Sequence, residues 1–191
     1  GLMGWASSDV DCKGKSRETL LPLSLLPMGG CGEMGKMVDN YLLQWKNGAE
    51  SDMLFTFPGI GDGSFIIDAE CPRFGTGEGK AVIRNTVRGH DLYILCDITN
   101  YSQTYKMYGV QAPMSPDDHF QDLKRLIAAA GNKPQRITVI MPFLSDGRQH
   151  RRTARQSLDC AMALLDLTQQ GVANIMTFCS HATILQTSSA P

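Results

Sequence analysis

Several features are absent from this sequence of 191 residues, and each absence excludes a class of protein. The formal net charge is −1, so there is no overall positive charge to attract nucleic acid or a membrane surface. No apolar run is long enough to span a bilayer, and the N-terminal residues lack a signal-peptide pattern. Six cysteines occur without a Cys-x-x-Cys pair. We therefore expect a soluble, cytoplasmic protein with reduced thiols, not a disulfide framework or a zinc site.

The sequence does contain an alternation of apolar strands with amphipathic helices. Apolar or β-branched runs typical of strands occur at 81–84, 92–96, 137–141 and 172–178. Apolar residues recur at helical spacing within 33–45, 116–130 and 157–170. The order strand, helix, strand, helix, strand from 92 to 178 is typical of α/β proteins with right-handed crossovers. The sequence thus predicts an α/β fold in which a parallel sheet is flanked by helices.

The segment Ser115-Pro-Asp-Asp118 predicts where the middle helix begins. Ser115 can cap the helix and Pro116 suits its first position, while the two acidic residues favour the positive end of the helix dipole. Asp117 and Asp118 together could also suggest a metal site, but capping is the better explanation. Gly131 is expected to end the helix.

The spacing of apolar residues also predicts which face of the other two helices is buried. In the first helix the expected core-facing stripe is Met37, Val38, Tyr41, Leu42 and Trp45. In the last helix the corresponding stripe is Leu158, Ala161, Met162 and Leu165. Two β-like segments, 53–57 and 64–68, are separated by a turn and are expected to pair. The apolar patch at 20–26 suggests no chemistry.

The stretch from Arg136 to Arg155 carries the clearest functional signal. An apolar strand ends at Pro142 and a turn, after which come the basic or potentially basic side chains Arg148, His150, Arg151, Arg152 and Arg155. In open parallel sheets ligands bind outside the carboxyl ends of the strands, and guanidinium groups contact phosphate oxygens in pairs. The pattern indicates a polyphosphate site. A solvated basic face or a weak nucleic-acid patch would account for the same charges.

Three blocks of sequence occur in order between residues 73 and 181. The first joins Arg73-Phe-Gly-Thr-Gly-Glu78 to Thr86-Val-Arg-Gly-His-Asp-Leu-Tyr-Ile-Leu95. The second is Arg136-Ile-Thr-Val-Ile-Met-Pro-Phe143 followed by Arg148-Gln149, and the third is Ala173-Asn-Ile-Met-Thr-Phe178 leading to His181. Together they resemble the N-terminal half of the ribose-phosphate diphosphokinases, the phosphoribosyl-pyrophosphate synthetase family, in a divergent bacterial form.

This resemblance implies a phosphoribosyltransferase-like fold and a specific domain organisation. Residues 34–191 correspond to the ATP-side domain of the family, residues 1–33 stay unassigned, and the C-terminal domain of the family is not in this chain. The family transfers the diphosphoryl group of Mg²⁺-ATP to ribose 5-phosphate and so makes phosphoribosyl pyrophosphate for nucleotide biosynthesis. Such a transfer depends mainly on positioning and on neutralising charge at phosphate oxygens.

The resemblance also implies roles for single residues. Arg148 is expected to contact the nucleotide phosphates and Gln149 the nucleotide, with Arg151 and Arg152 as further candidates for phosphate contact. His181 is expected to bind the Mg²⁺-triphosphate.

A glycine-rich loop supplies the remaining candidates. Phe74 is expected to stack on adenine, and Glu78 to bind the base or the ribose. In the family this loop reaches into the ATP site of a neighbouring subunit, so the resemblance implies a homo-oligomer. No residue is assigned a catalytic role.

The sequence departs from the family pattern near the metal-binding histidine. Cys179 stands where an acid is expected, and a thiol is a poor ligand for Mg²⁺. The chain also ends before the family's basic catalytic loop and its ribose 5-phosphate loop, so that site is expected largely outside these residues, and this chain alone is not expected to turn over. A non-catalytic, synthetase-associated assembly or regulatory subunit is therefore the alternative. An RNA-binding module ranks third because no aromatic residues interleave with the arginines.

Overall fold

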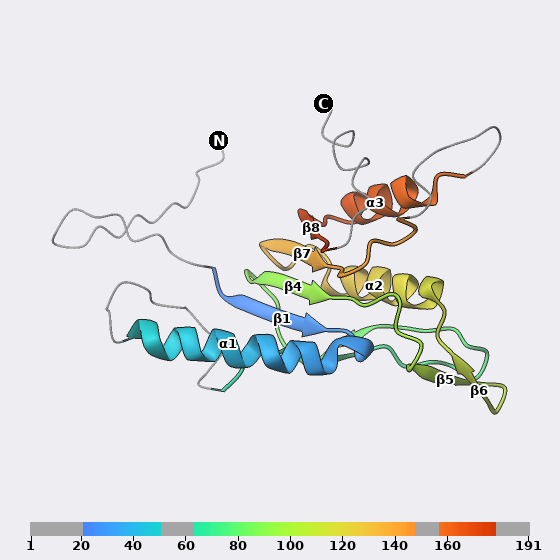
Figure 1. The fold of residues 1–191 in the computed structure, drawn as a ribbon, viewed down its shortest axis with the longest axis horizontal. Helices are drawn as coiled ribbons and strands as arrows, with labels where there is room; N and C mark the ends of the chain where they lie inside the picture. Colours follow the sequence, from blue (N-terminus) through green and yellow to red (C-terminus); the bar gives the residue numbers. More distant parts are fainter. Residues whose placement is uncertain (1–20, 51–62, 148–156, 179–191) are drawn as a thin grey trace.

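The computed structural model describes residues 21–50, 63–147 and 157–178 (Figure 1). Its centre is a parallel sheet of strands in the order β1-β4-β7-β8. These strands are β1 (Leu23–Pro27), β4 (Asp91–Leu95), β7 (Arg136–Ile140) and β8 (Asn174–Met176). The predicted α/β fold with a parallel sheet is confirmed. Within the described ranges, no helix is both long and apolar enough to cross a membrane.

Helices cover both faces of this sheet. A short 3-10 turn, η1 (Gly29–Cys31), leads into α1 (Gly32–Glu50), and the other helices are α2 (Pro116–Ala130) and α3 (Asp159–Gln169). Alternate residues of the strands pack toward different helices: Leu25 clusters with α1, whereas its neighbour Leu26 clusters with α2. This alternation explains why β1, β4 and β7 read as nearly continuous apolar runs.

The predicted start and end of the middle helix are confirmed in detail. The Ser115 hydroxyl accepts a hydrogen bond from the Asp118 backbone N–H at 3.1 Å, and the Asp118 carboxylate accepts one from the Ser115 backbone N–H at 2.9 Å. Gly131 adopts φ 57° and its N–H donates to the Ile127 carbonyl oxygen at 3.0 Å. Asp118 therefore serves as part of a capping box.

The predicted buried face of α1 is wrong in part. Val38 and Leu42 pack against the sheet, but the stripe Met37, Tyr41 and Trp45 is 61, 60 and 68% exposed. Successive residues of a helix project about 100° apart. The row that begins at Met37 and the row that begins at Val38 therefore cannot both face the same flat sheet. Met34 and Leu43 complete the packed face.

The same correction applies to α3. Met162 and Leu165 were predicted to face the core but are exposed. The buried residues of this helix are Cys160, Ala163 and Leu167. Both stripes have helical spacing, so periodicity alone favoured the wrong one.

Two small antiparallel pairs extend from the sheet. Strand β2 (Ala69–Glu70) pairs with β3 (Val82–Ile83), and β5 (Thr104–Met107) pairs with β6 (Val110–Pro113). The patch at 20–26, for which the sequence suggested no chemistry, overlaps β1. Part of the predicted segment 64–68 lies beside β1 through a parallel bridge between Leu25 and Ile66. Residues 53–57 lie outside the described residues, so the predicted pairing of the two segments stays a prediction.

Candidate functional site

The carboxyl ends of all strands of the central sheet meet at one edge, because every pairing in it is parallel. The turn after β4 is tied to the turn after β1: the Asn100 side chain donates to the Gly30 carbonyl oxygen at 3.2 Å. A Cβ atom on Gly30 would approach the Asn100 amide nitrogen to 2.9 Å, so the Asn100 side chain would have to shift if a larger residue replaced Gly30. The buried His119 of α2 lies 2.8 Å from the Asn100 carbonyl oxygen.

The ends of β7 and β8 are also joined at this edge. The Phe178 N–H donates to the Pro142 carbonyl oxygen at 3.3 Å, and the Thr177 hydroxyl donates to the same oxygen at 3.4 Å. After β7 the chain turns at Ser145–Gly147, where Asp146 has φ 53°. The chain continues toward Arg148 after Gly147 and toward His181 after Phe178, so both segments follow the joined ends of β7 and β8.

The glycine-rich loop lies between β2 and β3 and is a closed turn. The Phe74 N–H donates to the Glu78 carbonyl oxygen at 2.7 Å, and the Gly77 N–H donates to the Phe74 carbonyl oxygen at 2.9 Å. Gly77 adopts φ 92°, which favours glycine. The Phe74 side chain is 55% exposed and Glu78 is also exposed, so both candidate residues face solvent.

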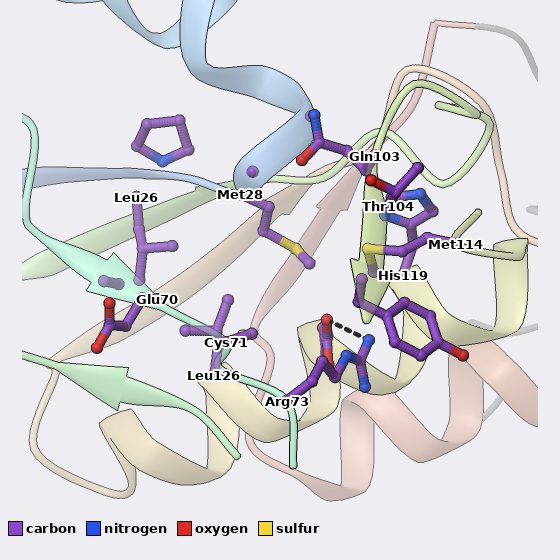
Figure 2. A pocket seen from close by; sticks show the side chains of 16 residues that line it. Leu26, Met28, Glu70, Cys71, Arg73, Gln103, Thr104, Met114, His119 and Leu126 are labelled. Atoms are coloured by element: carbon purple, nitrogen blue, oxygen red, sulfur yellow. Dashed lines mark hydrogen bonds and ion pairs between the residues drawn. The ribbon is translucent and has the colours of Figure 1, made fainter. Parts of the chain in front are cut away.

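Beside this loop is a cavity of about 270 Å³ (Figure 2). Side chains reach it from the end of β1, from the loop, from the β5–β6 pair and from α2. Its walls include apolar side chains such as Met28 and Leu126, together with the ion pair between Arg73 and Asp122. Among the described residues, no buried side-chain nitrogen or oxygen lacks a hydrogen-bond partner. The cavity therefore presents a mixed surface in which the buried charges are already compensated.

Comparison with known proteins decides the family. A model of the N-terminal domain of ribose phosphate pyrophosphokinase matches residues 24–171. The chain belongs to that family. It is 29% identical over 121 residues to ribose-phosphate pyrophosphokinase 1 of Schizosaccharomyces pombe, covering 62% of this chain and 26% of that protein. It is 27% identical over 126 residues to ribose-phosphate pyrophosphokinase of Chlorobaculum tepidum, covering 65% of this chain and 34% of that protein.

A solved structure gives the same fold. The crystal structure of phosphoribosylpyrophosphate synthetase from Mycobacterium smegmatis superposes with a TM-score of 0.52 at 18% identity, covering 82% of this chain and 42% of that one. At this identity the likeness shows the fold alone. The chain spans about a third or less of the length of the curated pyrophosphokinases that it matches.

Five of the residues that the pyrophosphokinase resemblance singled out lie outside the described residues. The candidates outside the described residues are Arg148, Gln149, Arg151, Arg152 and His181. Phe74 and Glu78 are described and lie on one loop. No group of three or more potential metal-ligating side chains occurs within 21–50, 63–147 and 157–178. The assigned roles of all these residues stay predictions.

Sequence reasoning missed the residues that hold this pyrophosphokinase loop in place. Tyr105 lies in β5 and Tyr108 in the turn after it, within residues 101–112, whose sequence shows no clear period. Its turn is Tyr108-Gly109, with φ 48° and 84°, between the paired residues Met107 and Val110. Positive φ at both central residues is typical of a tight two-residue hairpin, so the Tyr-Gly pair between β-forming residues was the available signal.

The cysteines in the described part of the chain are free, and Cys71 lines the cavity. Burial raises the pKa of the Cys71 thiol from 9.0 to about 12, and the charge of Asp122 adds to the effect. Because the pKa is higher in the folded protein, the stabilisation is fully present below pH 9 and is lost as the pH rises toward 12.

We therefore expect wild-type protein to lose more stability than Cys71→Ala between pH 9 and 12. The two losses of unfolding free energy should differ by about 2 kcal/mol. This is roughly half of the free energy that corresponds to the full change in pKa, because Cys71 is only partly buried and solvent screens its charge. Denaturant unfolding of both proteins across this range measures it. Parallel loss of stability in the two proteins would contradict the assigned pKa.

Proposed function

We propose that this chain is the nucleotide-binding part of a ribose-phosphate diphosphokinase, which transfers the diphosphoryl group of Mg²⁺-ATP to ribose 5-phosphate. Family membership supports the proposal. The observation that carries it is the joining of the ends of β7 and β8 at Pro142. The chain continues from these two strands into Arg148-Gln149 and toward His181, so a phosphate-binding arginine and a metal-binding histidine would start from one edge of the sheet.

The chemical groups of Mg²⁺-ATP match the types of side chain in the proposed site. Guanidinium groups of Arg148, Arg151 and Arg152 would contact phosphate oxygens, and Phe74 and Glu78 would contact the base and ribose. His181 is the residue of this chain that would hold Mg²⁺, since the metal takes few protein ligands when it is bound with a nucleotide. The bound metal would neutralise charge on the phosphate oxygens.

We also propose that the working unit is a homo-oligomer. Phe74 and Glu78 are exposed on the surface of the single chain. That exposure supports a loop that completes the nucleotide site of a neighbouring copy. The ribose 5-phosphate site would lie largely in the part of the pyrophosphokinases that this chain does not span.

Calorimetric titration of Mg²⁺-ATP into the protein tests the nucleotide site. We expect saturable binding that Arg148→Ala abolishes. The matched control is Arg84→Ala, because Arg84 is an exposed arginine whose ion pairs are with Asp68 and Glu70 at 2.9 and 2.7 Å. This control should bind ATP like the wild type.

Absence of binding in every protein would contradict the proposed nucleotide site. If the protein then still formed an oligomer, the alternative of a non-catalytic assembly or regulatory subunit would be favoured. Binding of RNA that weakens steeply with salt would instead favour a nucleic-acid module.

A further inference from the structure

Asp122, in the middle of α2, forms ion pairs with two arginines. The Arg73 guanidinium donates to one carboxylate oxygen of Asp122 at 2.7 Å, and the Arg125 guanidinium donates to the other at 2.7 Å (the dashed line at Arg73 in Figure 2 marks the first pair). The side chains of Arg73 and Asp122 are only 7 and 4% exposed. Arg125 lies one turn along the same helix, whereas Arg73 comes from the loop 49 residues earlier in the chain.

Arg73 directly precedes Phe74, and the backbone of the loop that follows is constrained. Its backbone closes on itself through the hydrogen bonds between Phe74, Gly77 and Glu78. At Gly79 an added Cβ atom would lie 2.7 Å from an Arg73 guanidinium nitrogen and 2.8 Å from one of Arg125. The two guanidinium groups therefore pack directly against the far end of the loop.

The β5–β6 pair holds the loop from another side. The guanidinium carbon of Arg73 lies 4.9 Å from the centre of the Tyr105 ring, a cation–π contact. The Tyr108 N–H donates to the Gly75 carbonyl oxygen at 2.9 Å. Tyr108 itself has a positive φ of 48°, which non-glycine residues adopt only where the surrounding structure imposes it.

We propose that Asp122 is a positioning residue for the nucleotide site: through Arg73 it fixes the loop that presents Phe74 and Glu78. This inference rests on the proposed function, in which that loop contacts the base and ribose. Arginine stays charged at every relevant pH, so a buried Arg73 without its carboxylate must move toward water. Because Arg73 and Phe74 are adjacent, that movement displaces the loop. The phosphate contacts proposed for Arg148 follow β7, which is separated from β1 by β4 in the sheet, so the substitution should leave them in place.

The test compares two probes on wild-type protein and Asp122→Asn, after thermal melts have shown that both are folded. The probes are Mg²⁺-ATP and Mg²⁺-tripolyphosphate, which lacks base and ribose. Suppose that the loop keeps its binding-competent position in only about a tenth of the Asp122→Asn molecules. The Kd for ATP then rises about tenfold, while the Kd for tripolyphosphate stays within about twofold of the wild-type value. General destabilisation would weaken both probes alike, so the ratio of the two constants reports loop position.

Further variants make the test decisive. Asp166→Asn is the matched control, because Asp166 also pairs with a cation of α2, Lys124 at 2.8 Å, but away from the loop. It should leave both constants unchanged. If Asp122→Asn does not fold, Arg73→Lys keeps the charge but loses the planar group stacked on Tyr105, and should raise the ATP constant alone.

The two possible failures are distinguishable. If wild-type protein binds neither probe, the proposed function fails. If wild-type protein binds ATP and Arg148→Ala does not, but the ratio of the two constants is unchanged in Asp122→Asn and Arg73→Lys, the positioning role of Asp122 is overturned.

Discussion

Asp122→Asn is expected to lower the free energy of unfolding by about 3 to 5 kcal/mol, the typical cost of removing one partner from a buried ion pair. Asparagine has almost the same shape as aspartate, so the cost arises from charge and not from a cavity. Arg125 is 24% exposed and can turn toward water, but Arg73 is 7% exposed and would lose its compensating carboxylate. Urea unfolding monitored by circular dichroism measures the difference.

The exposed pair between Lys124 and Asp166 provides the comparison within the same protein. Its side chains are 27 and 46% exposed. Screened ion pairs at the surface contribute about 0 to 1 kcal/mol, so Asp166→Asn should change stability by less than that. Equal effects of the two substitutions would show that the carboxylate of Asp122 is not effectively buried.

Leu123→Ala should have an effect of similar size for a different reason. Leu123 is fully buried and belongs to the cluster that joins α2 to Ile94 of β4 and Val139 of β7. Truncating a buried leucine removes apolar contacts and leaves a cavity, which costs about 2 to 5 kcal/mol. The measurement is again urea unfolding, with the slope of the transition checked for two-state behaviour.

Gln121→Ala is the control for this substitution. Gln121 is exposed and lies two positions earlier on the same helix. Alanine is a slightly better helix former, so this variant should be as stable as the wild type or slightly more stable. A loss below about 1 kcal/mol in Leu123→Ala would mean that α2 is not firmly packed on the sheet.

Local rules predicted α2 and β7 well. The capping box at Ser115 and Asp118 depends on groups three residues apart, and the end at Gly131 depends on one backbone angle. The strand at 137–141 was apparent because both of its faces are buried, which leaves an unbroken apolar run. Family resemblance then identified the loop that contains Phe74, because that signal lies in residue identity and order.

The buried faces of the helices and the contacts between distant residues could not be predicted from local sequence. On α1 the rows that contain Val38 and Tyr41 are both apolar at helical spacing, and only the position of β1 selects the first. The hairpin that carries Tyr105 is short and mostly exposed, so its sequence shows no clear period. Its role became visible only where it meets Arg73.

By itself, therefore, the sequence determined the fold class, the alternation of strands and helices from 92 to 178 and the family, because these depend on neighbouring residues and on motif order. The tertiary structure decided which helix faces are buried and how the Phe74 loop is held. Those features depend on contacts between distant residues, such as Arg73 and Asp122, 49 positions apart. Local periodicity contains no information about such a pair, since the energy of a buried charge is set by whatever the fold brings beside it.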